Sequence, residues 1–175
     1  MSLLRFLGLG ERTPRDSGAG DTATVRRISS QLERIDPDKA KYLASFAYVL
    51  ARVANADLHI DESETAEMEK VVRGLASLEE SEAVLVVEIA KSQSRLLGGT
   101  ENYVVTREFR QITTREQRAE LLECVYAVAA SDGTISAVES SEITAIADEL
   151  GFTRPEANSL RSSYREKLSE FQTKT

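Results

Sequence analysis

Two copies of one pattern, 75 residues apart, constrain the fold of this chain more than any other feature. In each copy a mostly apolar helical run ends at an Asp, an Ile follows three residues later, and a Glu closes the pattern, over residues 54–64 and 129–139. A helical hairpin of this size cannot bury its own apolar face, so the two hairpins are expected to pack together. The pattern predicts two pseudo-symmetric helical hairpin repeats, over residues 38–76 and 114–150, packed around two central apolar helices.

The chain as a whole is predicted to be an all-α protein of about eight helices, because apolar residues recur at helical spacing and no long alternating segment recurs. With 175 residues, 41% of them apolar, it is long enough for one domain with a sizeable core. We expect an apolar N-terminal segment and flexible linker over residues 1–20, followed by a single helical domain over residues 21–175.

Local signals set the expected helix boundaries. Three expected helix starts have the capping-box form, in which Ser or Thr is followed three residues later by Glu. These pairs are Ser77 with Glu80, Thr113 with Glu116 and Ser136 with Glu139, and the segment Thr153-Arg154-Pro155-Glu156 is expected to open the last helix. The apolar run 83–87 could also form a buried strand, but the capping box before it favours a helix that continues to about Leu97. Gly151 is expected to end the helix that begins at Ser136.

The buried faces of two later helices follow from the spacing of their apolar residues. The helix that starts at Thr100 is expected to be anchored by Tyr103, Val104, Phe109 and Ile112. The last helix begins near Thr153 and is expected to continue well beyond residue 164. Its apolar positions are Leu160, Tyr164, Leu168 and Phe171.

The paired pattern resembles a known family. Its copies are Ala-Asn-Ala-Asp-x-x-Ile-Asp-x-x-Glu and Ala-Ala-Ser-Asp-Gly-x-Ile-Ser-x-x-Glu, and together they resemble the TerB-like family of bacterial tellurite-resistance-associated proteins over about residues 37–165. The resemblance implies an all-helical domain of two repeated hairpins, a divalent-metal site at the motif acids, and a link to membrane-associated stress systems. A similar domain precedes the J-domain of a membrane-anchored co-chaperone.

The second copy also matches the second half of an EF-hand calcium loop, with Gly133 at the sharp turn, Ile135 two residues on and Glu139 in the last place. The early ligand positions of such a loop would fall on Val128 and Ala130 within a helix, so this is not an EF-hand. An ion would need ligands from both hairpins, and Ca²⁺ is the expected ion. The candidate metal ligands are Asp57, Asp61, Glu64, Asp132 and Glu139.

A purely structural role for the same acids is the alternative. Ser136 can cap the helix that it precedes while Glu139 reaches back to the cap, and Asp61 with Glu64 has the same form. Asp132 can accept hydrogen bonds from turn amides. The two copies are also unequal, because Leu58 stands at the position of Gly133 and Ser136 at the position of Asp61.

No catalytic constellation accompanies these acids. The sequence has no phosphate-binding Gly loop, no zinc-type Cys/His spacing, and no Ser or Cys with a suitable His partner. The single cysteine, Cys124, is expected to be a buried core residue in a reducing compartment, and the single histidine, His59, to face solvent. We therefore expect a protein that is not an enzyme.

The net charge of the chain limits the classes of binding partner that we expect. The net charge is −7 and no basic stripe is visible, so nucleic acid is an unexpected partner and a divalent cation or a basic protein surface fits better. No apolar run reaches the ~20 residues of a membrane span, so we expect a cytoplasmic protein with an unknown protein partner. The apolar residues 1–9 could attach it peripherally to a membrane.

Two hypotheses for function remain. The first is a non-enzymatic TerB-like interaction or sensor module, linked to stress or tellurite resistance, that binds a divalent metal at the twin acidic turns. The alternative is a co-chaperone-like protein-interaction domain whose acidic turns are helix caps only, with no metal.

Overall fold

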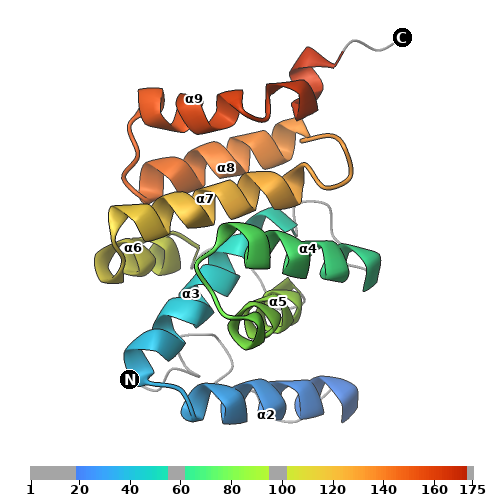
Figure 1. The fold of residues 1–175 in the computed structure, drawn as a ribbon, viewed down its shortest axis with the longest axis vertical. Helices are drawn as coiled ribbons and strands as arrows, with labels where there is room; N and C mark the ends of the chain where they lie inside the picture. The colour runs from blue at the N-terminus through green and yellow to red at the C-terminus, as the bar shows by residue number, and fades with distance from the viewer. Residues whose placement is uncertain (1–18, 55–61, 95–101, 173–175) are drawn as a thin grey trace.

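A computed structural model describes residues 19–54, 62–94 and 102–172 of the chain (Figure 1). These residues form eight α-helices and two short 3-10 helices. The α-helices are α2 (Ala19–Glu33), α3 (Pro37–Ala54), α4 (Glu62–Leu75), α5 (Glu80–Ser94), α6 (Asn102–Ile112), α7 (Arg115–Ala129), α8 (Ala137–Glu149) and α9 (Arg154–Ser162). The 3-10 helices are η1 (Arg165–Lys167) and η2 (Ser169–Phe171). The predicted all-α class is confirmed, and the apolar run 83–87 lies within α5.

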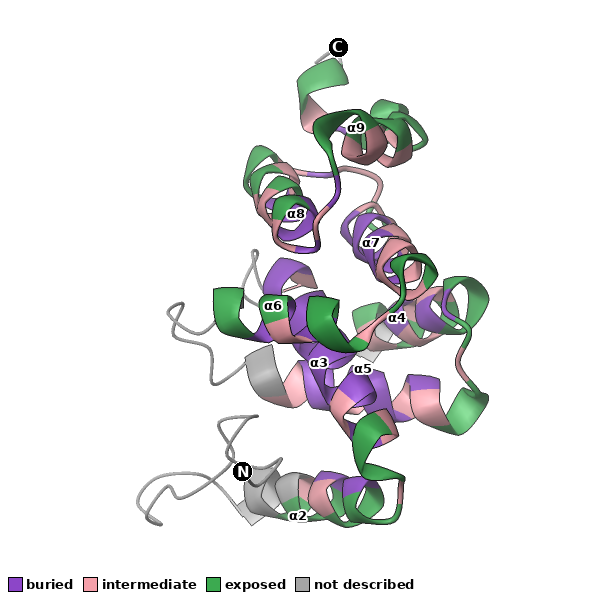
Figure 2. Cartoon of the chain, turned by 90° about the vertical axis from the view of Figure 1, so that its left-hand side faces the viewer, coloured by how far each residue is buried: buried purple, intermediate pink, exposed green. Residues whose placement is uncertain are grey.

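Helix α3 is the centre of the fold. Every residue from 42 to 53 is buried, and the helix contacts α2, α5, α6, α7 and α8 (Figure 2). Its sequence accounts for this position, because a helix that is apolar on nearly all sides is stable only when neighbours surround it. A ring cluster of Tyr42, Phe46 and Phe109 joins α3 to α6, with ring centres 5.6 to 6.1 Å apart.

Helix α7, the other predicted central helix, contacts α3 and buries seven residues between 121 and 129. Helix α5 is buried as deeply, with Ala83, Val86, Val87 and Ala90 fully covered, so three helices rather than two form the interior. The turn of the first hairpin lies in residues 55–61, outside the described residues. The pseudo-symmetry of the two hairpins therefore stays a prediction.

The interior of the described helices includes the charged side chain of Arg52. Arg52, near the end of α3, has a side chain that is only 4% exposed. Its guanidinium donates to Glu142 Oε1 at 2.7 Å, to Glu149 Oε2 at 2.6 Å and to Thr106 Oγ1 at 2.7 Å. Burial alone would lower the pKa of Arg52, but the hydrogen bonds and charges of the two glutamates outweigh it and raise that pKa. This Arg52 network ties α3 to α6 and α8.

The predicted inner face of α6 is right at Phe109 and wrong at its other three positions. Tyr103, Val104 and Ile112 are 55%, 58% and 39% exposed, whereas Val105, Thr106 and Phe109 are buried. The buried stripe includes a polar residue because the Thr106 hydroxyl accepts from Arg52. The spacing of apolar residues does not identify Thr106, because this polar residue is buried in order to hydrogen-bond with Arg52.

Two of these three predicted capping boxes are also wrong. Ser77 donates from its amide and its hydroxyl to Glu120 of α7, and α5 begins three residues later than the predicted cap. Helix α7 is capped by Thr114 with Gln117 rather than by Thr113 with Glu116, because the Thr113 hydroxyl donates to the carbonyl of Phe109. In both cases a competing acceptor moves the start of the helix.

The starts of α8 and α9 and the end of α8 agree with the positions that the sequence predicts. The box Ser136–Glu139 is present, α9 begins at Arg154 directly after Thr153, and Gly151 has the positive φ of +84° expected after a helix end. The last helix is shorter than predicted, because α9 ends at Ser162 and the chain continues through η1 and η2. Leu168 is buried all the same, by a contact with the turn before α8.

The Arg52 network gives a stability prediction. Arg52→Ala removes the only cation of the network and leaves two partly covered carboxylates side by side, so we expect a loss of about 3 kcal/mol in the free energy of unfolding. Urea denaturation measures it. The control is Arg73→Ala, which breaks the exposed pair with Glu80 and should cost about 1 kcal/mol or less. Equal losses in the two variants would contradict a structural role for the buried charge.

Candidate functional site

The second acidic turn joins α7 to α8 through residues 130–136. Gly133 has a φ of +98°, in the left-handed region that favours glycine, and no neighbouring atom would meet an added Cβ. The Asp132 carboxylate accepts the Thr134 amide at 2.9 Å, which fixes the turn locally. The requirement for Gly133 is therefore one of backbone geometry rather than of space.

Glu139 holds the start of α8. Its Oε2 accepts the Ser136 amide at 2.8 Å, and the Ser136 hydroxyl accepts the Glu139 amide at 3.2 Å. Glu139 is a buried residue even though it is charged. This reciprocal pair is the capping arrangement, so one carboxylate oxygen of this candidate ligand already has a structural use.

A segment from the end of the described chain covers the turn, and we call residues 165–172 the C-terminal clasp. Ile135 donates its amide to the carbonyl of Lys167 at 2.6 Å and accepts the amide of Ser169 at 2.9 Å. The side chain of Gln172 donates to the carbonyl of Gly133 at 3.0 Å and accepts the Thr134 hydroxyl at 2.9 Å. Backbone oxygens that a hard cation would use are thus hydrogen-bonded within the chain.

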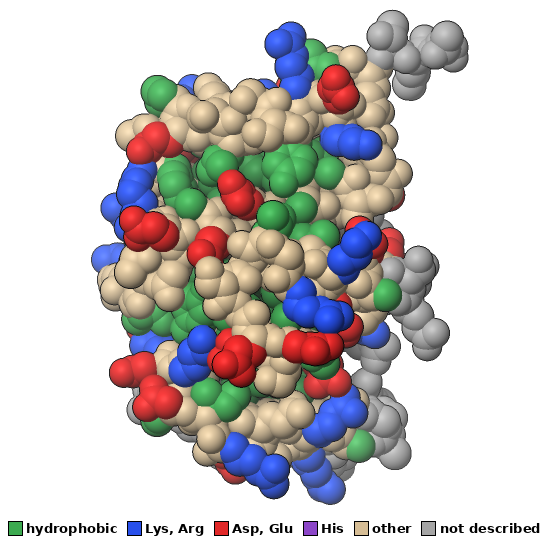
Figure 3. Space-filling view, viewed as in Figure 1, with side chains coloured by type: hydrophobic (Ala, Val, Ile, Leu, Met, Phe, Trp, Pro, Cys, Tyr) green, Lys and Arg blue, Asp and Glu red, His purple; other side chains and the backbone are tan. Residues whose placement is uncertain are grey.

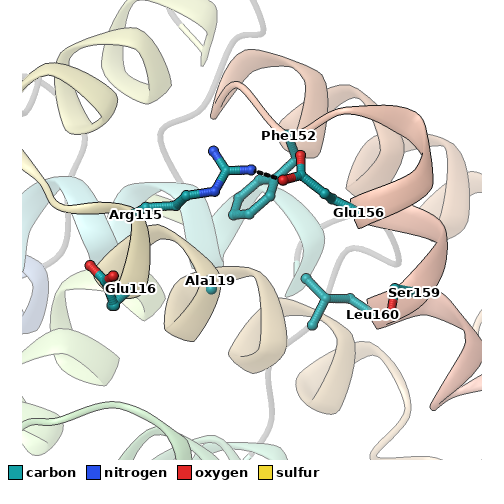
Figure 4. A pocket seen from close by; sticks show the side chains of 7 residues that line it. All are labelled: Arg115, Glu116, Ala119, Phe152, Glu156, Ser159 and Leu160. Atoms are coloured by element: carbon teal, nitrogen blue, oxygen red, sulfur yellow. Dashed lines mark hydrogen bonds and ion pairs between the residues drawn. The ribbon is translucent and has the colours of Figure 1, made fainter.

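A groove between α7 and α9, which we call the α7–α9 groove, is the second notable surface (Figure 4). It has a volume of about 350 Å³ and is lined by Arg115, Glu116, Ala119, Phe152, Glu156, Ser159 and Leu160. At one end the Arg115 guanidinium lies 5.0 Å from the centre of the Phe152 ring and pairs with Glu156. Hydrogen bonds from Thr153, together with Arg115, lower the pKa of Glu156 to about 2.

Cys124 offers no reactive thiol. Burial, with the charges of Glu123 and Glu120, raises its pKa to about 12, which disfavours the thiolate at neutral pH. The prediction that this cysteine is a buried core residue is confirmed.

A family model described as the tellurite resistance protein TerB matches residues 43–162. The chain belongs to the TerB family. The match extends from α3 through α9, so it includes both the second acidic turn and the α7–α9 groove. The resemblance predicted from the paired motifs is confirmed. No curated protein and no solved structure matches the chain.

In this TerB-family chain the structure places only some of the candidate metal ligands. Asp57 and Asp61 lie outside the described residues, as does His59. Glu64 lies in the first turn of α4, exposed, and Asp132 is exposed while Glu139 is buried. Within residues 19–54, 62–94 and 102–172, no three His, Cys, Asp or Glu side chains are grouped so as to hold a metal ion. A shared site is still a prediction.

The described helices connect the end of α3 to α8. Arg52 lies two residues before the end of α3, where the chain enters the first turn, and it contacts both Glu142 and Glu149, the last residue of α8. The end of the first central helix therefore lies beside the middle and the last turn of α8.

Sequence reasoning missed the C-terminal clasp. The signal available was Leu168, an apolar residue set among Lys167, Ser169 and other polar residues near the end of the chain. None of the helices in the described part of this TerB-family chain is long and apolar enough to cross a membrane.

The clasp gives a second stability prediction. Leu168→Ala leaves a cavity against Ile135, and we expect a loss of about 2–4 kcal/mol in the free energy of unfolding. Phe171→Ala is the matched control in the same segment, because Phe171 is 48% exposed and should cost about 1 kcal/mol or less. Thermal or urea denaturation distinguishes them. If both variants were as stable as the parent protein, the clasp would not contribute to the closure of the turn.

Proposed function

We propose that this TerB-family chain is a non-enzymatic protein-interaction module of a tellurite-resistance-type stress system. The observation that carries the proposal is that the polar groups of the second acidic turn are hydrogen-bonded to other groups of the same chain. Asp132, Glu139 and the carbonyls of Gly133 and Ile135 each accept a hydrogen bond from within the protein. A turn built this way supports a rigid helical scaffold whose outer surfaces meet a partner.

The charge of the chain indicates the kind of partner. The net charge of the whole chain is −7. A basic protein surface complements a chain of this charge and is attracted to it in dilute salt. Nucleic acid, which is itself an anion, is repelled by it.

Chemical crosslinking of the full-length protein in its native cell extract tests the proposal. We expect a discrete protein partner whose capture weakens as the salt concentration rises, since screening reduces attraction between exposed charges. The absence of any salt-sensitive protein partner would reject the interaction role.

Peripheral membrane contact through residues 1–9 is a separate part of the proposal. A variant that lacks residues 1–20 should lose partners from the membrane fraction and keep those from the soluble fraction, because a short apolar segment adds weak membrane affinity. Identical partner sets for the two proteins would remove the N-terminal anchor from the proposal.

A second candidate function is a sensor that binds Ca²⁺ between the two acidic turns, in the cytoplasm. It is favoured by the contact between Arg52 and Glu142, which joins the end of α3, just before the first turn, to the helix that follows the second turn. The ligands would be Asp57, Asp61, Glu64, Asp132 and Glu139. In that case each turn contributes too few oxygens alone, and the ion depends on the packing of the two hairpins.

Calcium titration separates the two functions. If Ca²⁺ binds, a concentration 100 times its Kd adds about 2.7 kcal/mol of stability, or roughly 5–10 °C in Tm. Glu139→Gln should abolish that shift, and it is a conservative change because the capping box of α7 already uses Gln117 at the equivalent position. Ser136→Ala is the control, since it weakens the cap and keeps the carboxylate. An unchanged Tm with millimolar Ca²⁺, Mg²⁺, Mn²⁺ or Zn²⁺ would leave the acidic turns as caps only.

A further inference from the structure

The C-terminal clasp contacts the turn before α8 in the way that an added strand contacts a sheet edge. In Figure 1 the chain after α9 lies next to the turn between α7 and α8. Leu168 has an extended backbone, with φ −69° and ψ 124°, and forms a parallel bridge with Ile135. The Ile135 amide donates to the carbonyl of Lys167, and the Ser169 amide donates to the carbonyl of Ile135. Proteins bind extended peptides through backbone pairing of this kind, which does not depend on the peptide sequence.

Two side chains of the clasp give the contact its sequence preference. Leu168 is only 1% exposed and is part of the hydrophobic core. The Gln172 amide group donates to the carbonyl of Gly133 at 3.0 Å and accepts the Thr134 hydroxyl at 2.9 Å. The turn therefore receives an apolar side chain at one position and an amide side chain four residues later.

The clasp has internal order of its own. It consists of η1 and η2, with Leu168 as the extended residue between them. The Arg165 guanidinium lies 4.8 Å from the centre of the Phe171 ring. The Phe171 amide donates to the carbonyl of Leu168 at 3.0 Å. A segment that is ordered in this way has less conformational freedom to lose when it binds the turn, so it can separate and rebind as a unit.

Most of the clasp is in contact with solvent. Leu168 is its one buried residue, and Ser169 is half-buried. The Arg161–Glu170 ion pair, which joins the clasp to α9, is also exposed and adds little stability. Figure 3 shows charged side chains at the surface beside the C-terminal end of the described chain. A segment that is held at so few points separates from the protein at a lower free energy than global unfolding requires.

We infer that the clasp is a displaceable cover, and that the turn beneath it is the docking site for an extended segment of a partner protein. The partner segment carries Leu, followed four residues later by Gln, because the clasp shows that the turn accepts these two side chains at this spacing. The inference rests on the proposed interaction function and names the surface and the kind of segment that it binds.

Competition with the clasp favours a partner protein over a second copy of this chain. The clasp is attached to its own turn and therefore has a high effective concentration there. A second copy offers an identical clasp and gains no advantage over the attached one. A partner that is also held by other contacts gives its segment a comparable effective concentration, so it can replace the clasp.

Hydrogen exchange of the unmodified full chain tests whether the clasp leaves the turn. We expect the protection factors of the Ile135 and Ser169 amides to be at least about 100-fold below those of the Val125 and Ile146 amides, because local opening costs less than unfolding. Val125 and Ile146 are buried within α7 and α8. Equal protection of all four amides would show that the clasp separates only when the whole protein unfolds, and would overturn the inference.

A synthetic peptide tests recognition by the turn. The probe has the sequence of residues 163–172, and the matched control peptide has Ala at the position of Leu168. We expect the probe to bind the full-length Leu168→Ala variant at least about tenfold more tightly than the parent chain, whose own clasp occupies the site for more of the time. Binding should shift the NMR signal of the Ile135 amide. The control peptide should bind at least about tenfold more weakly than the probe, because it lacks the buried side chain.

Two further variants of the full chain complete the comparison. Gln172→Ala weakens the clasp and keeps Leu168 in the core, so it should strengthen probe binding about twofold to fivefold even if Leu168→Ala does not fold. Glu166→Gln is the matched control and should bind the probe like the parent chain, because Glu166 is exposed and contacts Gln172 only through its carbonyl. Equal affinity of every variant for the probe, no binding, or shifts confined to another surface would overturn the inference.

Site-directed crosslinking separates failure of the docking site from failure of the proposed function. A photoreactive group attached at Ala137→Cys lies two residues after Ile135, and one at Ser30→Cys lies on the exposed surface of α2. The buried Cys124 does not compete for the label.

Capture from Ala137→Cys alone, at a partner segment in which Gln follows Leu by four residues, supports the docking site. Capture from Ser30→Cys alone overturns the site and keeps the interaction function, whereas capture from neither position rejects the site. Crosslinked dimers of the chain from Ala137→Cys would make a second copy the occupant and would also overturn the inference.

Discussion

The contact between the guanidinium of Arg52 and the carboxylates of Glu142 and Glu149 links the central helix α3 to α8. The buried stretch of α3 is otherwise almost entirely apolar, and apolar contacts have little directionality. A buried cation reduces the rotational freedom of the helix, because it is stable only where its carboxylates can reach it. Arg52 thereby helps to fix the positions of α6 and α8, together with the ring cluster and the Lys41–Glu108 ion pair that also join α3 to α6.

The acidic turn shows how the same side chains can serve structure or ion binding. A carboxylate that caps a helix and a carboxylate that holds a cation use the same oxygens. In the second turn Glu139 is already capping and the backbone oxygens are held by the C-terminal clasp. An ion at this place would share these oxygens with existing hydrogen bonds or displace them. The α7–α9 groove, in contrast, has an apolar floor in which Ala119 and Leu160 are only half-buried.

Sequence reasoning succeeded where the determinants are local. The repeated motif led to the TerB family, and Ser136 with Glu139 and Gly151 marked the ends of α8 because each acts within a few residues of itself. It failed where the position of a residue depends on a contact with a residue far away in the sequence. Ser77 is drawn to Glu120, Thr106 is buried for Arg52, and Leu168 is buried against Ile135. None of these partners is visible from spacing along the chain. The groove was missed for the same reason, because its walls come from separate helices.

The C-terminal clasp also has a consequence for the completion of the fold. Ile135 pairs with Lys167 and Ser169, more than thirty residues later in the chain. Without those residues, the backbone amide and carbonyl of Ile135 would lack the partners that they have in the folded protein. The turn therefore reaches its final form only when the clasp is laid across it.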